Sequence, residues 1–184
     1  MQSRRRPSRI LLVLVFFAIV PLLLGQQECV PTTVPDDGGG GGGGGGGETV
    51  PASILDLELD AYALVNQERA AYGLGALIMD ESVRAVARAH SEDMANRGYF
   101  SHDTPEGVTS SQRLTNAGIP WRMMGENIAK NMGYADPAYV AVDGWMNSAG
   151  HRANILNGDF THTGMGVAVD ADGYTIFTQV FVTP

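Results

Sequence analysis

The sequence predicts one α+β domain in which helices come first and an antiparallel β-hairpin closes the chain. Two observations predict it. Apolar residues recur at three- and four-residue steps from about residue 53 to residue 98, which is the period of a helix. Near the C-terminus apolar residues alternate with the period of a strand, over 165–169 and again over 174–182. The part of the chain from residue 48 onward has about 137 residues, the size of one ordinary domain.

Helix start and stop signals predict two long helices in the first half of this domain. Ser53 is a candidate N-cap of the first helix, which should end near Gly73, and Asp80 and Gly98 bound the second. The expected buried stripe of the first helix is Leu55, Leu59, Tyr62, Ala63, Asn66 and Ala70. That of the second helix is Val83, Val86, Ala87, His90 and Met94. We therefore expect His90 to be a buried, hydrogen-bonded residue rather than a ligand.

Shorter elements are expected between these helices and the hairpin. Helices are predicted over 109–117 and 136–148, and a short turn over 153–156. Asp136 followed by proline is a strong helix start. The residues of this helix that should face inward are Tyr139, Val142 and Trp145. The sequence Asp-Ala-Asp-Gly at 170–173 has the chemistry of a hairpin turn.

The first 29 residues have the composition of an export signal. Arginines precede an apolar run of 15 residues over 10–24, which is shorter than the roughly 20 that a membrane-spanning helix needs. An uncleaved signal anchor is the alternative, and either one places the rest of the chain outside the cytoplasm. Cys29 is the only cysteine, so no intrachain disulfide can form. It lies where a bacterial lipoprotein carries its lipid; in the alternative, an ordinary secreted protein, it has no such role.

Residues 30–52 are a predicted flexible linker between this leader and the domain at 53–184. The ten consecutive glycines in the linker have no side chains to bury. From residue 48 onward, 17 Asp and Glu stand against 8 Lys and Arg, a net charge of −9. A domain this acidic lacks the positive surface that nucleic acid requires. We expect no nucleic-acid partner, and membrane association only through the leader or a lipid on Cys29.

Four motifs stand out because they set polar residues among apolar residues and glycines. They are FSHDTPEG, GENIA, GWMNSAGHRANIL and FTHTGMGVAV, which begin at Phe100, Gly125, Gly144 and Phe160. In this order and at these separations, the four motifs resemble the bacterial branch of the CAP superfamily. That superfamily is named after cysteine-rich secretory proteins, antigen 5 and pathogenesis-related 1 proteins, and its domain is also called the SCP domain. The resemblance covers about residues 54–182.

The resemblance implies an α-β-α sandwich, in which a small antiparallel sheet lies between helical layers, and a large central cleft. Similar proteins line that cleft with two His and one or two Glu, and the matching positions here are His102, His151 and Glu126. The second Glu of many eukaryotic members would fall at Ser148, so that carboxylate is missing. Ser148 and Asn127 are further candidate ligand-binding residues of the cleft, although an Asn in this context also suits the capping of backbone groups.

The chemistry of the two His and the Glu leaves alternatives open. His102 and His151 are candidate ligands for zinc or another divalent cation, with Glu126 as the general base for a bound water. Alternatively, Glu126 orients one imidazole, or it accepts backbone N–H groups of a neighbouring turn.

Two functions correspond to these alternatives. The first is an exported or envelope-tethered module whose cleft binds a peptide, lipid or glycan ligand outside the cytoplasm, with or without a divalent metal. The second is a metal-dependent hydrolase, and the sequence leaves open whether the chain is an enzyme. Arg152 has a role in neither, and we expect it to pair with a carboxylate such as Asp143 or Asp159.

Overall fold

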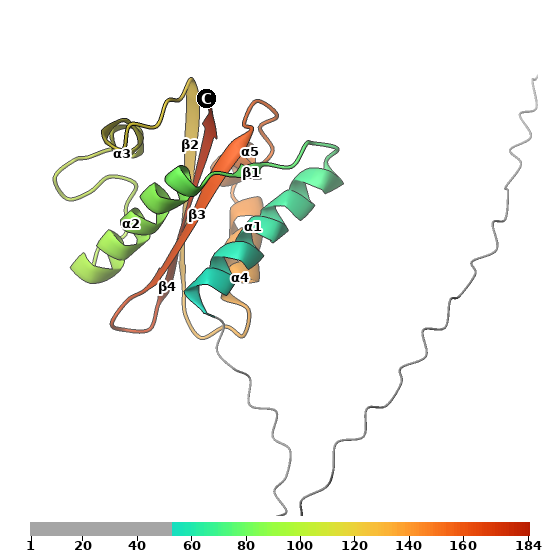
Figure 1. Cartoon of the computed structure of the whole chain (residues 1–184). Helices are drawn as coiled ribbons and strands as arrows, with labels where there is room; N and C mark the ends of the chain where they lie inside the picture. The colour runs from blue at the N-terminus through green and yellow to red at the C-terminus, as the bar shows by residue number, and fades with distance from the viewer. Residues whose placement is uncertain (1–52) are drawn as a thin grey trace, which may run out of the picture. The chain divides into compact units, whose positions relative to one another are not determined.

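The computed structural model describes residues 53–184, so the predicted leader, Cys29 and the whole predicted linker lie outside the described residues. Helices and strands follow one another along the described chain (Figure 1). Their order and bounds are α1 (Ile54–Ala71), β1 (Ile78–Met79), α2 (Glu81–Arg97), α3 (Ser110–Asn116), β2 (Met123–Asn131), α4 (Pro137–Met146), α5 (Ala149–Ile155), β3 (His162–Val169) and β4 (Thr175–Thr183). Among the described residues, no helix combines the length and hydrophobicity needed to cross a membrane.

The helix caps that were predicted from the sequence are present in the structure. Asp80 accepts hydrogen bonds from the backbone N–H groups of Ser82 and Val83 at the start of α2. Gly98 ends that helix in the left-handed conformation, with a φ of 69°. Asp136 caps α4 through the N–H of Tyr139. Local sequence chemistry therefore sets the ends of these helices.

The sheet contains the predicted hairpin and two strands that the sequence does not predict. The strand order is β1-β3-β4-β2. β3 and β4 are antiparallel, with Met165 opposite Gln179, and β2 is antiparallel to β4, with Glu126 opposite Val180. The short β1 pairs with β3 in parallel, so the sheet is antiparallel except at that edge. The hypothesis that the Glu126 carboxylate accepts backbone N–H groups of a neighbouring turn is wrong, because Glu126 lies within β2 and its donors are side chains.

The two faces of the sheet are covered by different helices. Phe177 and Phe181 of β4 pack in one core with residues of α1, α4 and α5. Val180 and Val182, which point the other way, pack with residues of α2 and α3. Figure 1 shows the same separation of the helices on either side of the sheet. The α+β class and the α-β-α sandwich are therefore confirmed.

The buried face of α1 is not the stripe expected from its apolar residues. Leu55 and Leu59 are 48% and 44% exposed. The residues that are buried instead are Leu57, Glu58, Ala61, Val65 and Arg69. A search for apolar periodicity misses this face because two of its residues are charged. In α4, Tyr139 was also expected to face inward and is exposed, whereas Val142 and Trp145 are buried as expected.

Both buried charges of α1 are compensated. The Glu58 carboxylate accepts from Arg84 Nη2 at 2.6 Å and from Arg88 Nε at 2.8 Å, and it also accepts from the backbone N–H of Val167. One carboxylate thus joins α1, α2 and β3. Arg69 donates to backbone carbonyls of the segments before β1 and β3 and to that of Ile155, the last residue of α5, at 2.7 Å. Removing either charged side chain would leave unpaired polar groups in the interior, which is strongly destabilising.

α2 lies in direct backbone contact with β3 because two residues of the strand are glycines. A Cβ atom at Gly164 would lie 2.2 Å from the backbone N of Arg84, and one at Gly166 would lie 2.1 Å from that of Arg88. No side chain can occupy these positions unless the helix moves away from the sheet. The two glycines therefore set the distance between the layers.

We predict that Gly166→Ala lowers the free energy of unfolding by about 3 kcal/mol, because overpacking forces two backbones apart. Gly150→Ala is the matched control, since a Cβ at that helical position meets nothing within 4 Å. The control should be neutral or slightly stabilising. Chemical denaturation of both variants measures the effect. Equal stability of the two variants would contradict the proposed contact.

Candidate functional site

The candidate site lies at the edge strand β2, where side chains from both faces of the sheet come within reach of one another. Glu126 pairs with Val180 and therefore points to the face that α2 and α3 cover. The next residue, Asn127, points to the opposite face, on which α5 and His151 lie. Because β2 ends the strand order, groups on the two faces can meet around its free edge.

Glu126 is buried and both of its carboxylate oxygens are engaged. Oε1 accepts from His102 Nδ1 at 2.9 Å. Oε2 accepts from Ser110 Oγ at 2.8 Å and from Arg113 Nη2 at 2.6 Å. The side chain of Glu126 is 4% exposed, whereas that of His102 is 52% exposed. The carboxylate therefore holds the loop before α3, and α3 itself, against β2.

The contact with Glu126 fixes the state of the His102 ring. Because a carboxylate accepts, Nδ1 of His102 carries the proton and Nε2 is left for other partners. The hydrogen bond to Glu126 raises the pKa of His102, although burial opposes this. Burial alone would raise the pKa of Glu126, but the hydrogen bond from His102 and the charge of Arg113 outweigh it and lower that pKa.

His151 lies in α5 and has a different environment. Among the described residues, none forms a hydrogen bond with its ring. Burial lowers the pKa of His151, and the charge of the nearby His102 lowers it further. The two imidazoles of the site therefore favour opposite charge states, one charged and the other neutral, at a pH near their ordinary value.

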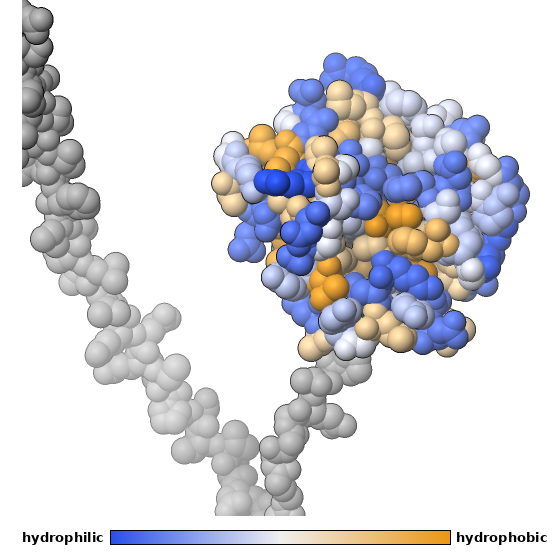
Figure 2. Space-filling view, turned by 180° about the vertical axis from the view of Figure 1, so that it is seen from behind, coloured by the Kyte–Doolittle hydropathy of each residue, from blue (hydrophilic) through white to orange (hydrophobic). Residues whose placement is uncertain are grey.

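A groove of about 280 Å³ runs along β2 from Asn131 to His151. Its other wall is α4, with Val140, Ala141 and Gly144, and Phe100 of the loop before α3 also lines it. Ser148 lines the groove, as expected for a cleft residue. Figure 2, which views the domain from behind, shows hydrophobic residues gathered among hydrophilic ones on that side of the molecule.

Asn127 does not line this groove. It is fully buried, its Nδ2 donates to the carbonyl of His151 at 3.1 Å, and its Oδ1 accepts from Asn154. Asn154 also donates to the carbonyl of Glu126 at 3.2 Å. The two asparagines therefore tie α5 to β2, which positions His151, and they act through the backbone as expected of capping residues.

Other expectations for polar residues have mixed outcomes. His90 is buried, and its Nε2 is 3.0 Å from the carbonyl of Ser101, as predicted. Arg152 pairs with neither expected carboxylate. It donates to the hydroxyl of Tyr72 at 2.8 Å, and Asp143 accepts from Asn147 instead.

Sequence reasoning missed Ser110 and Arg113. Arg113 is the cation beside Glu126, and it also donates to the carbonyls of His102 and Val108. A basic residue in the last turn of a short helix is common, so Arg113 has no distinguishing pattern in the sequence. Only its position between a buried carboxylate and a polar loop identifies it.

Comparison with known proteins identifies the family. The sequence profile of CAP, the cysteine-rich secretory protein family, matches residues 62–181. This chain belongs to the CAP family. Its domain is 40% identical over 134 residues to the uncharacterized protein YkwD of Bacillus subtilis (strain 168), a match that covers 73% of this chain and 50% of YkwD. The CAP chain thus spans about half the length of that relative.

Two solved structures resemble this CAP domain. One is an extracellular protein containing an SCP domain from Bacillus anthracis str. Ames, with a TM-score of 0.62 and 33% identity, covering 74% of this chain and 45% of that one. The other is an outer surface protein from Borrelia burgdorferi, with a TM-score of 0.65 and 20% identity, covering 72% of this chain and 96% of that one. The second likeness concerns the fold alone.

The opposite pKa shifts of His102 and His151 can be measured. We predict that NMR titration places the pKa of His102 above the ordinary value of 6.5 and that of His151 below it. Glu126→Gln should lower the pKa of His102, because the carboxylate is removed, whereas Glu92→Gln on the exposed side of α2 should leave it unchanged. Equal pKa values for the two rings would contradict the geometry.

The same shifts set the pH dependence of stability. A raised pKa of His102 stabilises the fold below about pH 6.5, and this contribution is lost as the pH rises through the folded-state pKa. A lowered pKa of Glu126 stabilises it above about pH 4.5, and this is lost as the pH falls. The contribution of His102 and Glu126 to the free energy of unfolding is the difference between the parent chain and Glu126→Gln. It should be largest between about pH 4.5 and about pH 6.5 and decline on either side.

Proposed function

We propose that the protein is an exported CAP-domain binding module that holds an extended peptide of the cell envelope in the groove between β2 and α4. The observation that carries the proposal is that one wall of this groove is the free edge of the sheet. The apolar run and arginines of the leader, and the extracellular SCP-domain protein of Bacillus anthracis, support a location outside the cytoplasm. Tethering through a lipid on Cys29 is part of the same proposal.

The free edge of β2 offers main-chain groups to a ligand. The carbonyls of Glu126 and Ile128 accept from side chains, Asn154 and Trp145, and so point away from β4. In an antiparallel strand the peptide groups of alternate residues face the same side, so those of Lys130 also point away from β4. Lys130 lines the groove. No side chain among the described residues bonds to them. An added strand would pair with such groups.

A buried acceptor in the groove also lacks a donor. Asn131 is 8% exposed and donates to the carbonyl of Pro137, but its Oδ1 has no partner among the described residues. A peptide N–H can satisfy this oxygen, whereas the hydrocarbon chain of a lipid cannot. The acceptor therefore favours a peptide over a lipid in this position.

The hydrolase alternative has less support because its general base is occupied. Three donors already bind Glu126, so this carboxylate positions the loop and is not free to activate water. Without Glu126, the protein donors left for a metal are Nε2 of His102 and the ring of His151. Catalytic zinc sites use three protein ligands. In residues 53–184, no group of three or more His, Cys, Asp or Glu could hold a metal, so the donors do not fit a resident catalytic zinc.

We predict that peptide binding changes the fluorescence of Trp145, which lies in the groove wall. Trp121→Phe leaves Trp145 as the one tryptophan, since the sequence has two. Titration with synthetic peptides of about six residues, a murein stem peptide among them, should give a saturable change. Gly144→Leu should abolish the change by filling the groove, because a Cβ at this lining residue meets no other atom within 4 Å.

Gly75→Leu is the control for that variant, since its Cβ also meets nothing and the residue lies outside the groove. It should bind like the parent chain. Saturable binding of lauric acid or chitobiose alone would contradict the peptide as ligand. No change with any probe, or equal loss in both leucine variants, would contradict the groove itself.

We further predict that zinc binds only weakly, through the two imidazoles. Isothermal titration of the full chain with zinc should give low affinity that His102→Ala and His151→Ala each remove. His162→Ala is the control, because His162 lies at the start of β3, where its ring contacts Thr161. One zinc per chain retained through dialysis against a chelator would restore the hydrolase hypothesis.

A further inference from the structure

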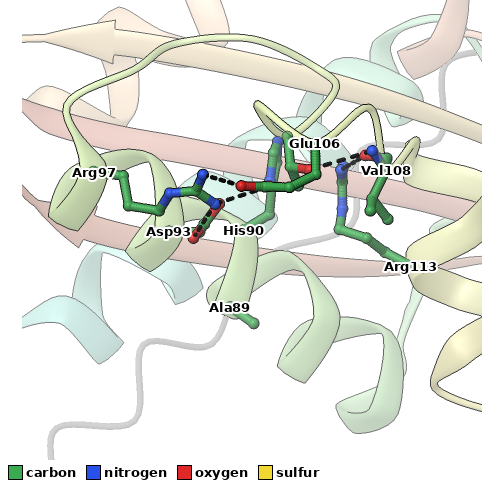
Figure 3. Close-up of a pocket in the computed structure, with 8 residues that line it drawn as sticks. Ala89, His90, Asp93, Arg97, Glu106, Val108 and Arg113 are labelled. Atoms are coloured by element: carbon green, nitrogen blue, oxygen red, sulfur yellow. Dashed lines mark hydrogen bonds and ion pairs between the residues drawn. The ribbon is translucent and has the colours of Figure 1, made fainter.

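A second cavity, of about 350 Å³, lies beneath the loop between α2 and α3, apart from the groove (Figure 3). Its lining includes His90, Asp93, Arg97, Glu106, Val108 and Arg113. None of these residues lines the groove between β2 and α4. The volume is many times the roughly 30 Å³ that one molecule of liquid water occupies. The cavity therefore has room for a small organic molecule.

Each charged side chain around this cavity has a partner of opposite charge, and Arg97 is shared by two carboxylates. Arg97 Nη1 lies 3.0 Å from Glu106 Oε2 and 3.4 Å from Asp93 Oδ2 (Figure 3). Arg113 is paired with Glu126. An anionic ligand would need an uncompensated cation, and a cationic ligand would need an uncompensated carboxylate. No charged side chain of the lining is without such a partner, which favours a neutral ligand.

Two buried polar atoms of the lining have no partner among the described residues: Nδ1 of His90 and Nε of Arg113. Nε2 of His90 lies 3.0 Å from the carbonyl of Ser101 and must donate to it, so Nδ1 carries a lone pair. Burial and the charge of Arg113 lower the pKa of His90, which keeps the ring neutral. Nε of Arg113, in contrast, always carries a hydrogen. Two residues that line the cavity thus hold one buried unpaired acceptor and one buried unpaired donor.

A hydroxyl group answers both requirements, because it donates one hydrogen bond and accepts others. We propose that this cavity binds a neutral polyhydroxylated molecule, a sugar residue or similar polyol, with one hydroxyl donating to His90 Nδ1 and accepting from Arg113 Nε. Asp93, Arg97 and Glu106 also line the cavity and can bond to further hydroxyls, and Ala89 and Val108 add apolar surface for the carbon face of a sugar ring.

The test follows the imidazole nitrogens of His90 in the full chain, labelled with nitrogen-15, during titration with N-acetylglucosamine and with glycerol. A hydroxyl that donates to Nδ1 should give a saturable shift of that resonance, with the proton kept on Nε2. Ala89→Trp should weaken binding by about tenfold or more, because Ala89 lines the cavity. Ala85→Trp, on an exposed position one turn earlier in α2, should change it by no more than about twofold.

Three results would overturn the proposal. The first is an Nδ1 resonance that neither probe shifts saturably, which would mean that only water fills the cavity. The second is a saturable shift with sodium sulfate but not with the sugar, which would indicate an anion site. The third is equal weakening by the two tryptophan variants, which would place binding elsewhere. None of these depends on the groove, whose occupancy Trp145 reports separately.

Discussion

The backbone contact between α2 and β3 at Gly164 and Gly166 is the constraint on which the rest of the domain depends. Because two main chains touch there, α2 can neither slide nor rotate over the sheet without a clash. The fixed register turns Arg84 and Arg88 toward Glu58, so a charge buried in α1 finds its partners. The same register carries His90 of α2 beneath the loop that leads to α3. The second cavity, which residues of α2 line, depends on this contact.

On that frame, Glu126 is best understood as a positioning residue. Its carboxylate is buried at the edge of the sheet, and such a charge is stable only when its oxygens are fully hydrogen-bonded. His102, Ser110 and Arg113 meet that requirement from the loop and from α3. The result is that the loop is fixed where His102 meets the solvent. His151 reaches the same edge by a separate route, through the asparagines that tie α5 to β2.

The parts of this architecture that follow local rules could be predicted from the sequence. The ends of α2 and α4 are set by capping residues, and the hairpin by alternation, so these were predicted correctly. β2 could not be predicted because its residues serve two faces at once. Glu126 points to one helical layer and Asn127 to the other, both are buried and polar, and no alternation remains to be detected. The buried face of α1 was predicted wrongly for a similar reason. Its charged residues, Glu58 and Arg69, are stable in the interior only because residues far away in the sequence pair with them.

Two of the three expected site residues, His102 and Glu126, are in direct contact. Arg113, which binds Glu126 and the loop before α3, could not be recognised as a site residue from the sequence. Its guanidinium uses Nη2 for Glu126 and Nη1 for the carbonyls of His102 and Val108, and its buried Nε has no partner among the described residues. A planar group with five donors in a fixed fork can meet all of these demands, and a lysine could not. Loss of this side chain would therefore remove hydrogen bonds to the backbone of the loop at two points, His102 and Val108. The position of this loop thus depends in part on one cation whose role is visible only in three dimensions.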